Sequence, residues 1–365
     1  MKFEDVFHNE LLTLPKSVPE SKSFFEYVKE LLHNYILLLE SVKQKKQKIE
    51  GLKKEINLDN VIPIQKEFVD GLINTLQIYY DGKPAQAYEN FSKTIKSRTR
   101  KYKELLNTNY FAENESFYRI RTRDENFPFN SNEMFHIPFE LRGIVTTQRY
   151  SIPGFPSLYL GKTLYIAWEE LQRPRLESFQ AVRLKSMKRI KYLDLTANEW
   201  GDNNLNKLAY KYLMTWPLIA VCSIKVKTHK NTFKEEYIVP QLLLQWVRNN
   251  KDIDAVKYNS THIENRQLKC AGGLYNIVLP VKEIKDKGYC THLVELFETT
   301  ETISKQLVDL STGGGVFLYN TSEIKLIDSK MPYIEIIKGQ KSPYSQSVLG
   351  SLEYKLDLMK TKKII

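Results

Sequence analysis

The segment Arg149-Tyr-Ser-Ile-Pro-Gly-Phe-Pro-Ser-Leu-Tyr-Leu-Gly-Lys-Thr-Leu-Tyr-Ile-Ala-Trp-Glu-Glu170 predicts a bend, a strand and a helix in direct succession. Two prolines and a glycine at positions 153, 154 and 156 are typical of a tight bend. Residues 157–161 are largely apolar and predict a short strand. Thr163 can cap the helix that follows. That helix has apolar residues at the spacing of one buried face, namely Tyr165, Ala167, Trp168 and Leu171.

Three polar residues of this segment have a spacing that resembles a known family. Tyr159 lies ten residues after Arg149, and Glu170 lies eleven residues after Tyr159. With Pro-Gly after the arginine and an alanine before the glutamate, this pattern is similar to the RES domain, which is named for its Arg, Glu and Ser. Downstream, the run Asp252-Ile-Asp-Ala-Val-Lys-Tyr-Asn-Ser260 resembles the family's serine motif. Upstream, Phe117-Tyr-Arg119-Ile resembles the tyrosine-arginine pair that opens the domain.

The resemblance covers roughly residues 115 to 285, about half of the chain. The family often has glycine before the arginine and a bulky aromatic residue after it, whereas Gln148 and Tyr150 flank Arg149 here. Asp254-Ala255 likewise replaces the usual glycine before the serine motif. These changes keep the reactive groups in place, but they alter how closely the backbone can approach a ligand.

The resemblance implies an α+β fold with an ADP-ribosyltransferase-like mixed sheet. It also implies an enzyme that cleaves the nicotinamide–ribose bond of NAD by phosphorolysis or hydrolysis. Breaking this bond develops positive charge on the ribose as neutral nicotinamide departs, so a carboxylate beside the sugar stabilises the transition state. The pyrophosphate of NAD requires cations. The resemblance thus implies NAD as the substrate and inorganic phosphate as a candidate co-substrate, and it implies neither a prosthetic group nor a metal.

The residue types match these tasks. Glu170 is expected to hold a ribose hydroxyl and to offset the developing charge. Arg149 is expected to bind the pyrophosphate or an incoming phosphate bidentately, with Arg119 as a second donor. Tyr159 offers a ring on which nicotinamide can stack, and Ser260 offers a hydroxyl that orients the glutamate or the ribose.

Composition sets the broad class. With 365 residues, 42% of them hydrophobic, the chain is long enough for several folded domains. The 54 basic and 43 acidic residues give a net charge of +11, which suits a phosphorylated partner or simply a solvated lysine-rich surface. Three cysteines without paired short spacing predict neither a disulfide framework nor a zinc site, so we expect a reducing cytoplasm. The start lacks a signal peptide's apolar core, and no apolar run approaches a membrane helix.

The hydrophobic pattern predicts three regions. Residues 1–112 have helical periodicity and predict an all-helical domain. Residues 113–285 alternate short strands with few helices and form the expected RES domain. Residues 286–365 form a C-terminal extension of unknown role, with a helix expected near 293–310. A basic run between Lys93 and Lys103 suits nucleic acid or a solvated helix face, but it lacks the aromatic and glycine interleaving of known binding modules.

Three hypotheses follow for function. The first is an NAD-degrading bacterial toxin or phage-defence effector, whose helical domain would sense a trigger, dock an antitoxin or form a homo-oligomer. The second hypothesis uses the same site residues but transfers ADP-ribose to a protein or nucleic acid. Its only support in the sequence is a second carboxylate, Glu169, beside Glu170. Because the spacing assigns the family position to Glu170, we interpret Glu169 as its outward-facing neighbour. The third is a non-catalytic module that binds nucleic acid. No catalytic role is assigned to His136, because no nucleophilic serine or cysteine stands beside it.

Overall fold

The computed structural model describes residues 9–44, 49–50, 55–100, 105–123, 127–197, 206–263, 274–312, 324, 331, 333–337 and 339–365. The chain forms two compact units. The first comprises Met1–Asn109, Gln148–Tyr150 and Leu193–Trp246, and the second comprises Tyr110–Thr147, Ser151–Tyr192 and Val247–Ile365. The expected α+β class with an N-terminal helical region is confirmed. The functional boundaries expected after residues 112 and 285 stay a prediction, and the compact units divide the chain differently.

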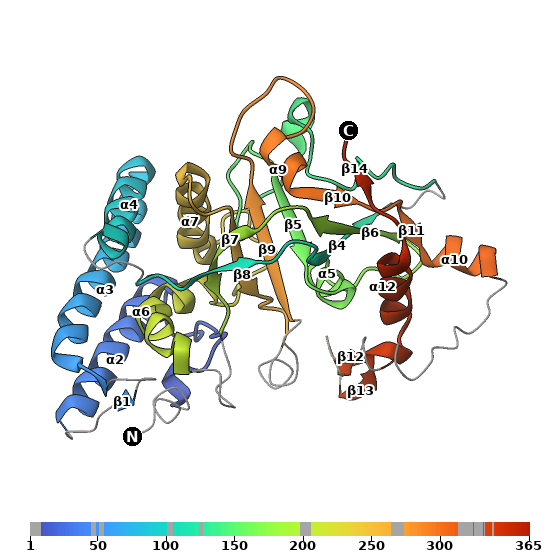
Figure 1. The fold of residues 1–365 in the computed structure, drawn as a ribbon. Helices are drawn as coiled ribbons and strands as arrows, with labels where there is room; N and C mark the ends of the chain where they lie inside the picture. The colour runs from blue at the N-terminus through green and yellow to red at the C-terminus, as the bar shows by residue number, and fades with distance from the viewer. Residues whose placement is uncertain are drawn as a thin grey trace. The chain divides into compact units, whose positions relative to one another are not determined.

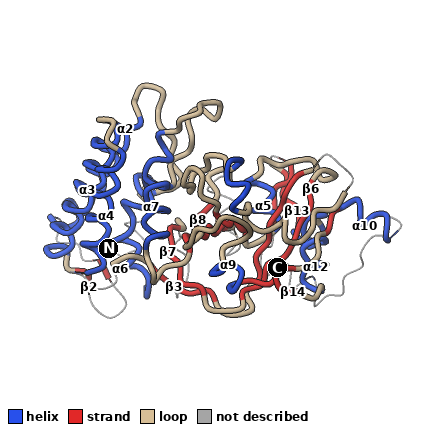
Figure 2. The backbone as a smooth tube through the Cα atoms, turned by 90° about the horizontal axis from the view of Figure 1, so that it is seen from above, coloured by secondary structure: helices blue, strands red, loops and turns tan. Residues whose placement is uncertain are grey.

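The first unit is built mainly from helices. They are α2 (Phe24–Gln44), α3 (Leu58–Tyr80), α4 (Pro84–Arg100), α6 (Asn206–Cys222) and most of α7 (Ile238–Asn249). In Figures 1 and 2, α2, α3 and α4 lie side by side. Tyr35 of α2 stacks on Trp216 of α6, with ring centroids 4.6 Å apart. The Tyr35 hydroxyl and the Gln65 side chain of α3 both donate to the Leu213 carbonyl at 2.8 Å, so α6 is joined to the N-terminal helices.

Most residues of a ten-stranded sheet belong to the second unit (Figure 1). Its order is β14 (Lys362–Lys363), β10 (Phe297–Thr299), β6 (Phe179–Ser186), β4 (Ser116–Thr122), β5 (Ser157–Gly161), β9 (Tyr275–Pro280), β8 (Ala255–Asn259), β7 (Ile190–Leu195) and β3 (Thr108–Phe111), with β11 (Ile303–Ser304) also paired to β6. The central pairs β6–β4, β4–β5, β5–β9 and β9–β8 are antiparallel. A separate hairpin joins β12 (Tyr333–Ile337) to β13 (Gln340–Pro343).

The two faces of this sheet carry two hydrophobic clusters. Leu158 and Leu160 of β5 belong to one cluster, together with Phe117 of β4. Tyr118 of β4 belongs to the other cluster, which includes α5 (Leu164–Glu170) and α12 (Val348–Leu358). Because successive strand side chains point to opposite faces, Tyr159 lies on the face that α5 covers.

The central segment folds as its local sequence predicts. The Phe155 amide donates to the Ile152 carbonyl at 2.9 Å, and Gly154 has φ +74° at the third position of the turn. Proline followed by glycine in a left-handed conformation is typical of a type II turn. The Thr163 side chain accepts from the Ile166 amide at the start of α5. The prediction that Leu171 is buried is wrong, because its side chain lies just past the helix end and is 43% exposed.

Gly161 allows α5 to pack closely on the strand that precedes it. A Cβ atom at this position would lie 2.9 Å from both the Ala167 nitrogen and the Thr163 oxygen. Both are backbone atoms, so the clash cannot be relieved by a side-chain rotation. We therefore expect Gly161→Ala to destabilise the protein by about 1–3 kcal/mol. A lowered denaturant midpoint would show this, whereas Gly143→Ala, where the added Cβ meets nothing within 4 Å, should leave the midpoint nearly unchanged.

Residues beyond 285 are part of the second unit. The prediction of one helix near 293–310 is wrong. The short helix α9 (Thr291–Leu296) is followed by the strands β10 and β11, and a second helix, α10 (Lys305–Thr312), begins after them. The register of β10 pairs Phe297 with Ser186 of β6, so this stretch extends the sheet. Leu349, Leu352 and Leu356 of α12 are buried in the cluster that contains α5. None of the described helices combines the length and apolar character needed to cross a membrane.

Candidate functional site

Glu170 is held by an asparagine from a neighbouring strand. The Asn276 side-chain nitrogen donates to Glu170 Oε1 at 2.9 Å, and Asn276 is 3% exposed. The register pairs Asn276 with Gly161 of β5 on one side and with Tyr258 of β8 on the other. Ile277 belongs to the cluster on the opposite face, so Asn276 points toward α5. A single amide side chain in an otherwise apolar strand is a signal in the sequence that could have identified Asn276.

Tyr159 lies on the same face as Asn276, close to it in the sheet. It pairs with Val278, and Gly161, two residues further along β5, pairs with Asn276. Diagonal neighbours of this kind on one face lie within reach of aromatic side chains. Tyr159 is partly exposed, unlike Leu158 and Leu160 on either side. The ring therefore stands near the Glu170–Asn276 pair with one part open to solvent.

Ser260 follows the last residue of β8. Asn259 pairs with Tyr275, which places Ser260 next to the strand that carries Asn276. Ser260 is 1% exposed, and its hydroxyl oxygen accepts from the His262 amide at 3.2 Å. This turn fixes the serine, and a serine hydroxyl that accepts one hydrogen bond can still donate another.

Arg119 is a buried cation beside β5. Its Nη1 donates to the Tyr159 carbonyl at 2.9 Å, where the short β4–β5 ladder has ended. Among the described residues, its buried Nε has no hydrogen-bond partner. The pKa of Arg119 is lowered to about 9, mainly by burial and in part by the neighbouring Arg121, while Tyr159 acts in the opposite direction. An anion at this guanidinium would offset the cost of burying its charge.

Arg119 and Glu170 do not share one face of the sheet. Arg119 lies two residues after Phe117, so it leaves β4 on the face opposite to α5. Its guanidinium nevertheless reaches the backbone of β5 at Tyr159, whose ring points to the other face. A ligand that contacts both Arg119 and Glu170 would have to pass the end of the β4–β5 ladder.

Arg149 belongs to the first unit, whereas the other predicted site residues belong to the second. Its Nη1 donates to the Cys222 carbonyl at 3.1 Å, and its guanidinium carbon lies 5.2 Å from the centre of the Tyr237 ring. The expected convergence of Arg149 with Glu170 stays a prediction.

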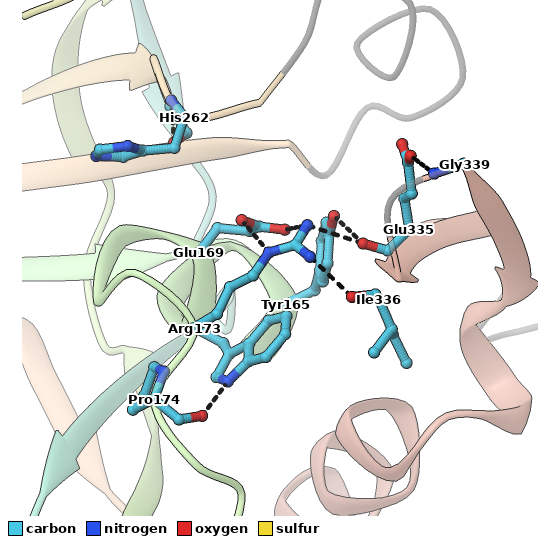
Figure 3. A network of polar contacts seen from close by, with 10 residues as sticks. Tyr165, Glu169, Arg173, Pro174, His262, Glu335, Ile336 and Gly339 are labelled. Carbon is cyan, nitrogen blue, oxygen red and sulfur yellow. Dashed lines mark hydrogen bonds and ion pairs between the residues drawn. The ribbon is translucent and has the colours of Figure 1, made fainter.

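The interpretation of Glu169 as an outward-facing carboxylate is wrong. Glu169 is 4% exposed, and Arg173 donates to its two oxygens, from Nε at 3.0 Å and from Nη2 at 2.7 Å (Figure 3). Tyr165, one helical turn earlier, shares this network, and burial followed by the hydrogen bond to Glu169 raises the pKa of its phenol. Residues 165 and 169 share one helix face. Glu170, the next residue, therefore points in a different direction, toward Asn276.

His136 has the surroundings of a structural histidine. It is 0% exposed, and its Nε2 accepts from the Cys290 amide at 2.9 Å. Its Nδ1 lies 2.7 Å from the Ile137 carbonyl and must carry the proton to donate there. Burial is the main cause that lowers the pKa of His136 to about 4; the hydrogen bond to Ile137 opposes it, and Arg119 and Arg121 act in the same direction as burial. The imidazole is therefore neutral at pH 7.

Two other features bear on cofactors and substrates. Among the residues that the structure describes, no group of three or more His, Cys, Asp and Glu could hold a metal ion. A cavity of about 650 Å³ lies between β6 and the start of α10, lined by Arg123, Gln180, Thr302 and Lys305 among others. None of Arg119, Tyr159, Glu170 and Ser260 lines it. The residues predicted for the candidate site therefore do not form this cavity.

A curated relative matches most of the chain. The sequence is 34% identical over 307 residues to the "Putative toxin YopC" of Bacillus subtilis (strain 168). The match spans 79% of this chain and 67% of the relative. No family model matches the sequence. No solved structure matches it either.

Proposed function

Since this chain belongs to the family of the Bacillus subtilis protein called "Putative toxin YopC", we propose that it is a bacterial toxin that destroys NAD. The proposed reaction breaks the bond between nicotinamide and ribose, with phosphate or water as the acceptor. An ADP-ribosyltransferase-like arrangement of the sheet is part of the proposal. The observation that carries it is the Glu170 carboxylate, oriented by Asn276 on the face that also presents Tyr159.

The chemistry of the proposed reaction suits this pair. As nicotinamide leaves, its electron pair goes with it and positive charge develops on the anomeric carbon and ring oxygen of the ribose. A carboxylate held in place before the reaction stabilises this charge without reorganising. The hydrogen bond from Asn276 leaves Glu170 a second oxygen, which can accept from a ribose hydroxyl. Tyr159 supplies the ring for the nicotinamide.

The cations have a separate task in this proposal. NAD carries a pyrophosphate, and Arg119 offers a buried guanidinium whose Nε has no partner among the described residues. Arg149 is the second proposed donor, for the pyrophosphate or for the phosphate that attacks the anomeric carbon. Phosphorolysis would form a bond from phosphate to that carbon and release nicotinamide and ADP-ribose 1-phosphate. Hydrolysis would release nicotinamide and ADP-ribose.

Incubation of the purified full chain with NAD, with and without inorganic phosphate, tests the proposal. We expect nicotinamide to be released, and the product that contains ADP-ribose shows which acceptor is used. An unchanged NAD pool contradicts the proposal. Radiolabel from NAD on a protein or nucleic acid would instead indicate a transferase. Steeply salt-dependent binding to DNA or RNA with intact NAD would indicate a binding module.

The structure weakens the sequence argument for the transferase. Glu169, the second carboxylate on which that hypothesis relied, is paired with Arg173. It is thus engaged within the fold, and we propose the NAD-degrading reaction ahead of transfer to a macromolecule. An enzyme that destroys cytoplasmic NAD must be silenced in the cell that makes it, so an antitoxin protein is the partner we propose.

A further inference from the structure

The helix that ends with Glu170 is too short to be stable by itself. α5 has seven residues, whereas isolated helices shorter than ~12–15 residues are marginal in water. Its order therefore depends on the groups that contact its two ends. Both ends are held by the part of the chain beyond residue 332, which lies outside the region that resembles the RES domain.

Glu353 of α12 holds the first residue of α5. Its Oε2 accepts from the Leu164 amide at 2.9 Å and from the Tyr344 hydroxyl at 2.6 Å. Glu353 is 2% exposed and Tyr344 is 0% exposed, so water does not compete for these bonds. A carboxylate at the start of a helix also interacts favourably with the helix dipole.

The main chain of β12 holds the residues that follow α5. Gln172 and Arg173 have φ of 60° and 58°, a left-handed conformation that non-glycine residues adopt at a cost. The Arg173 guanidinium donates to the Ile336 carbonyl at 2.7 Å and to the Glu335 carbonyl at 2.8 Å (Figure 3). The same guanidinium binds both carboxylate oxygens of Glu169, the residue before Glu170.

We propose that β12, Tyr344 and α12 form a C-terminal clamp that positions the catalytic carboxylate. Glu353 of the clamp and Arg173, which donates to the β12 carbonyls, are the positioning residues, one at each end of α5. This inference rests on the proposed function of Glu170, and it gives the C-terminal extension a specific role. The clamp acts through the backbone of α5, so it should govern where Glu170 lies without contacting NAD.

Hydrogen exchange of the α5 amides tests the clamp without reference to activity. We expect Glu353→Leu to raise the exchange rate of residues 164–170 about 10-fold or more, because the Leu164 amide loses a charged acceptor. Glu353→Gln keeps an acceptor oxygen and should restore most of the protection. Asp357→Asn is the matched control, since this α12 carboxylate binds Tyr118 of β4 and Arg183 of β6. The proposal would be overturned if the α5 amides of Glu353→Leu exchanged at the wild-type rate, or if Asp357→Asn lost as much protection of these amides as Glu353→Leu.

Arg173→Lys tests the other end of α5 and does not depend on the folding of the Glu353 variants. Lysine keeps the charge beside Glu169, but it cannot donate to both β12 carbonyls and both carboxylate oxygens at once. In Glu353→Leu and in Arg173→Lys we expect the kcat of nicotinamide release to fall about 10- to 100-fold with KM nearly constant. Unchanged kcat in both Glu353→Leu and Arg173→Lys contradicts the clamp. Inactive wild-type protein contradicts the proposed function instead, and amide exchange then still decides the clamp.

Discussion

Glu170→Gln should lower the rate of nicotinamide release at least about 100-fold and leave the fold intact. Glutamine has the shape of glutamate and keeps an oxygen that can accept from Asn276, which lies 2.9 Å from Glu170 Oε1. The substitution therefore removes the negative charge and little else. Because positive charge develops on the ribose only as the bond breaks, the loss should appear in kcat more than in KM.

The measurement compares the kcat of Glu170→Gln with that of wild type, and thermal unfolding checks that both are folded. Glu177→Gln is the matched control, because Glu177 is an exposed glutamate on the connection that follows α5. We expect this control to retain the wild-type rate. A Glu170→Gln protein that keeps more than half of the wild-type kcat would contradict the assignment of the carboxylate.

The second large effect concerns the dependence of stability on pH through His136. Its folded pKa of about 4 lies below the ordinary value of 6.5, so the unfolded chain binds more protons between these two values. The contribution of neutral His136 to stability is therefore complete above pH 6.5 and is lost as the pH falls toward 4. The difference amounts to about 3 kcal/mol across this window.

Urea unfolding of wild type and His136→Gln between pH 7.5 and 4 measures this contribution. Other groups titrate in the same range, so the difference between the two proteins is the informative quantity. We expect the variant to be less stable at pH 7.5 and to lose less stability on acidification. His33→Gln is the control, because His33 is exposed on α2. Parallel curves for wild type and His136→Gln would show that the buried imidazole does not set the slope.

Local sequence was sufficient for the central segment. The Pro153-Gly154 turn, the strand at 157–161 and the cap at Thr163 all occur where they were predicted. Each depends on groups within a few residues of one another, such as a glycine with positive φ or a side chain that accepts from the next turn. The helices of the N-terminal region were predictable for the same reason, because their apolar periodicity is a local property.

The surroundings of the candidate carboxylate were decided by tertiary structure. The partner of Glu170 is 106 residues away in the chain, and that of Leu164 is 189 residues away. The same holds for β10, which lies within a predicted helix but forms a strand because β6 offers it a partner. Spacing in the sequence identified Glu170 as the candidate. Only the packing of β9, β12 and α12 around α5 determined that Glu169 is buried and that Glu170 is held toward Asn276. Contacts between segments that are distant in the sequence depend on the fold of the whole chain, so local patterns do not predict them.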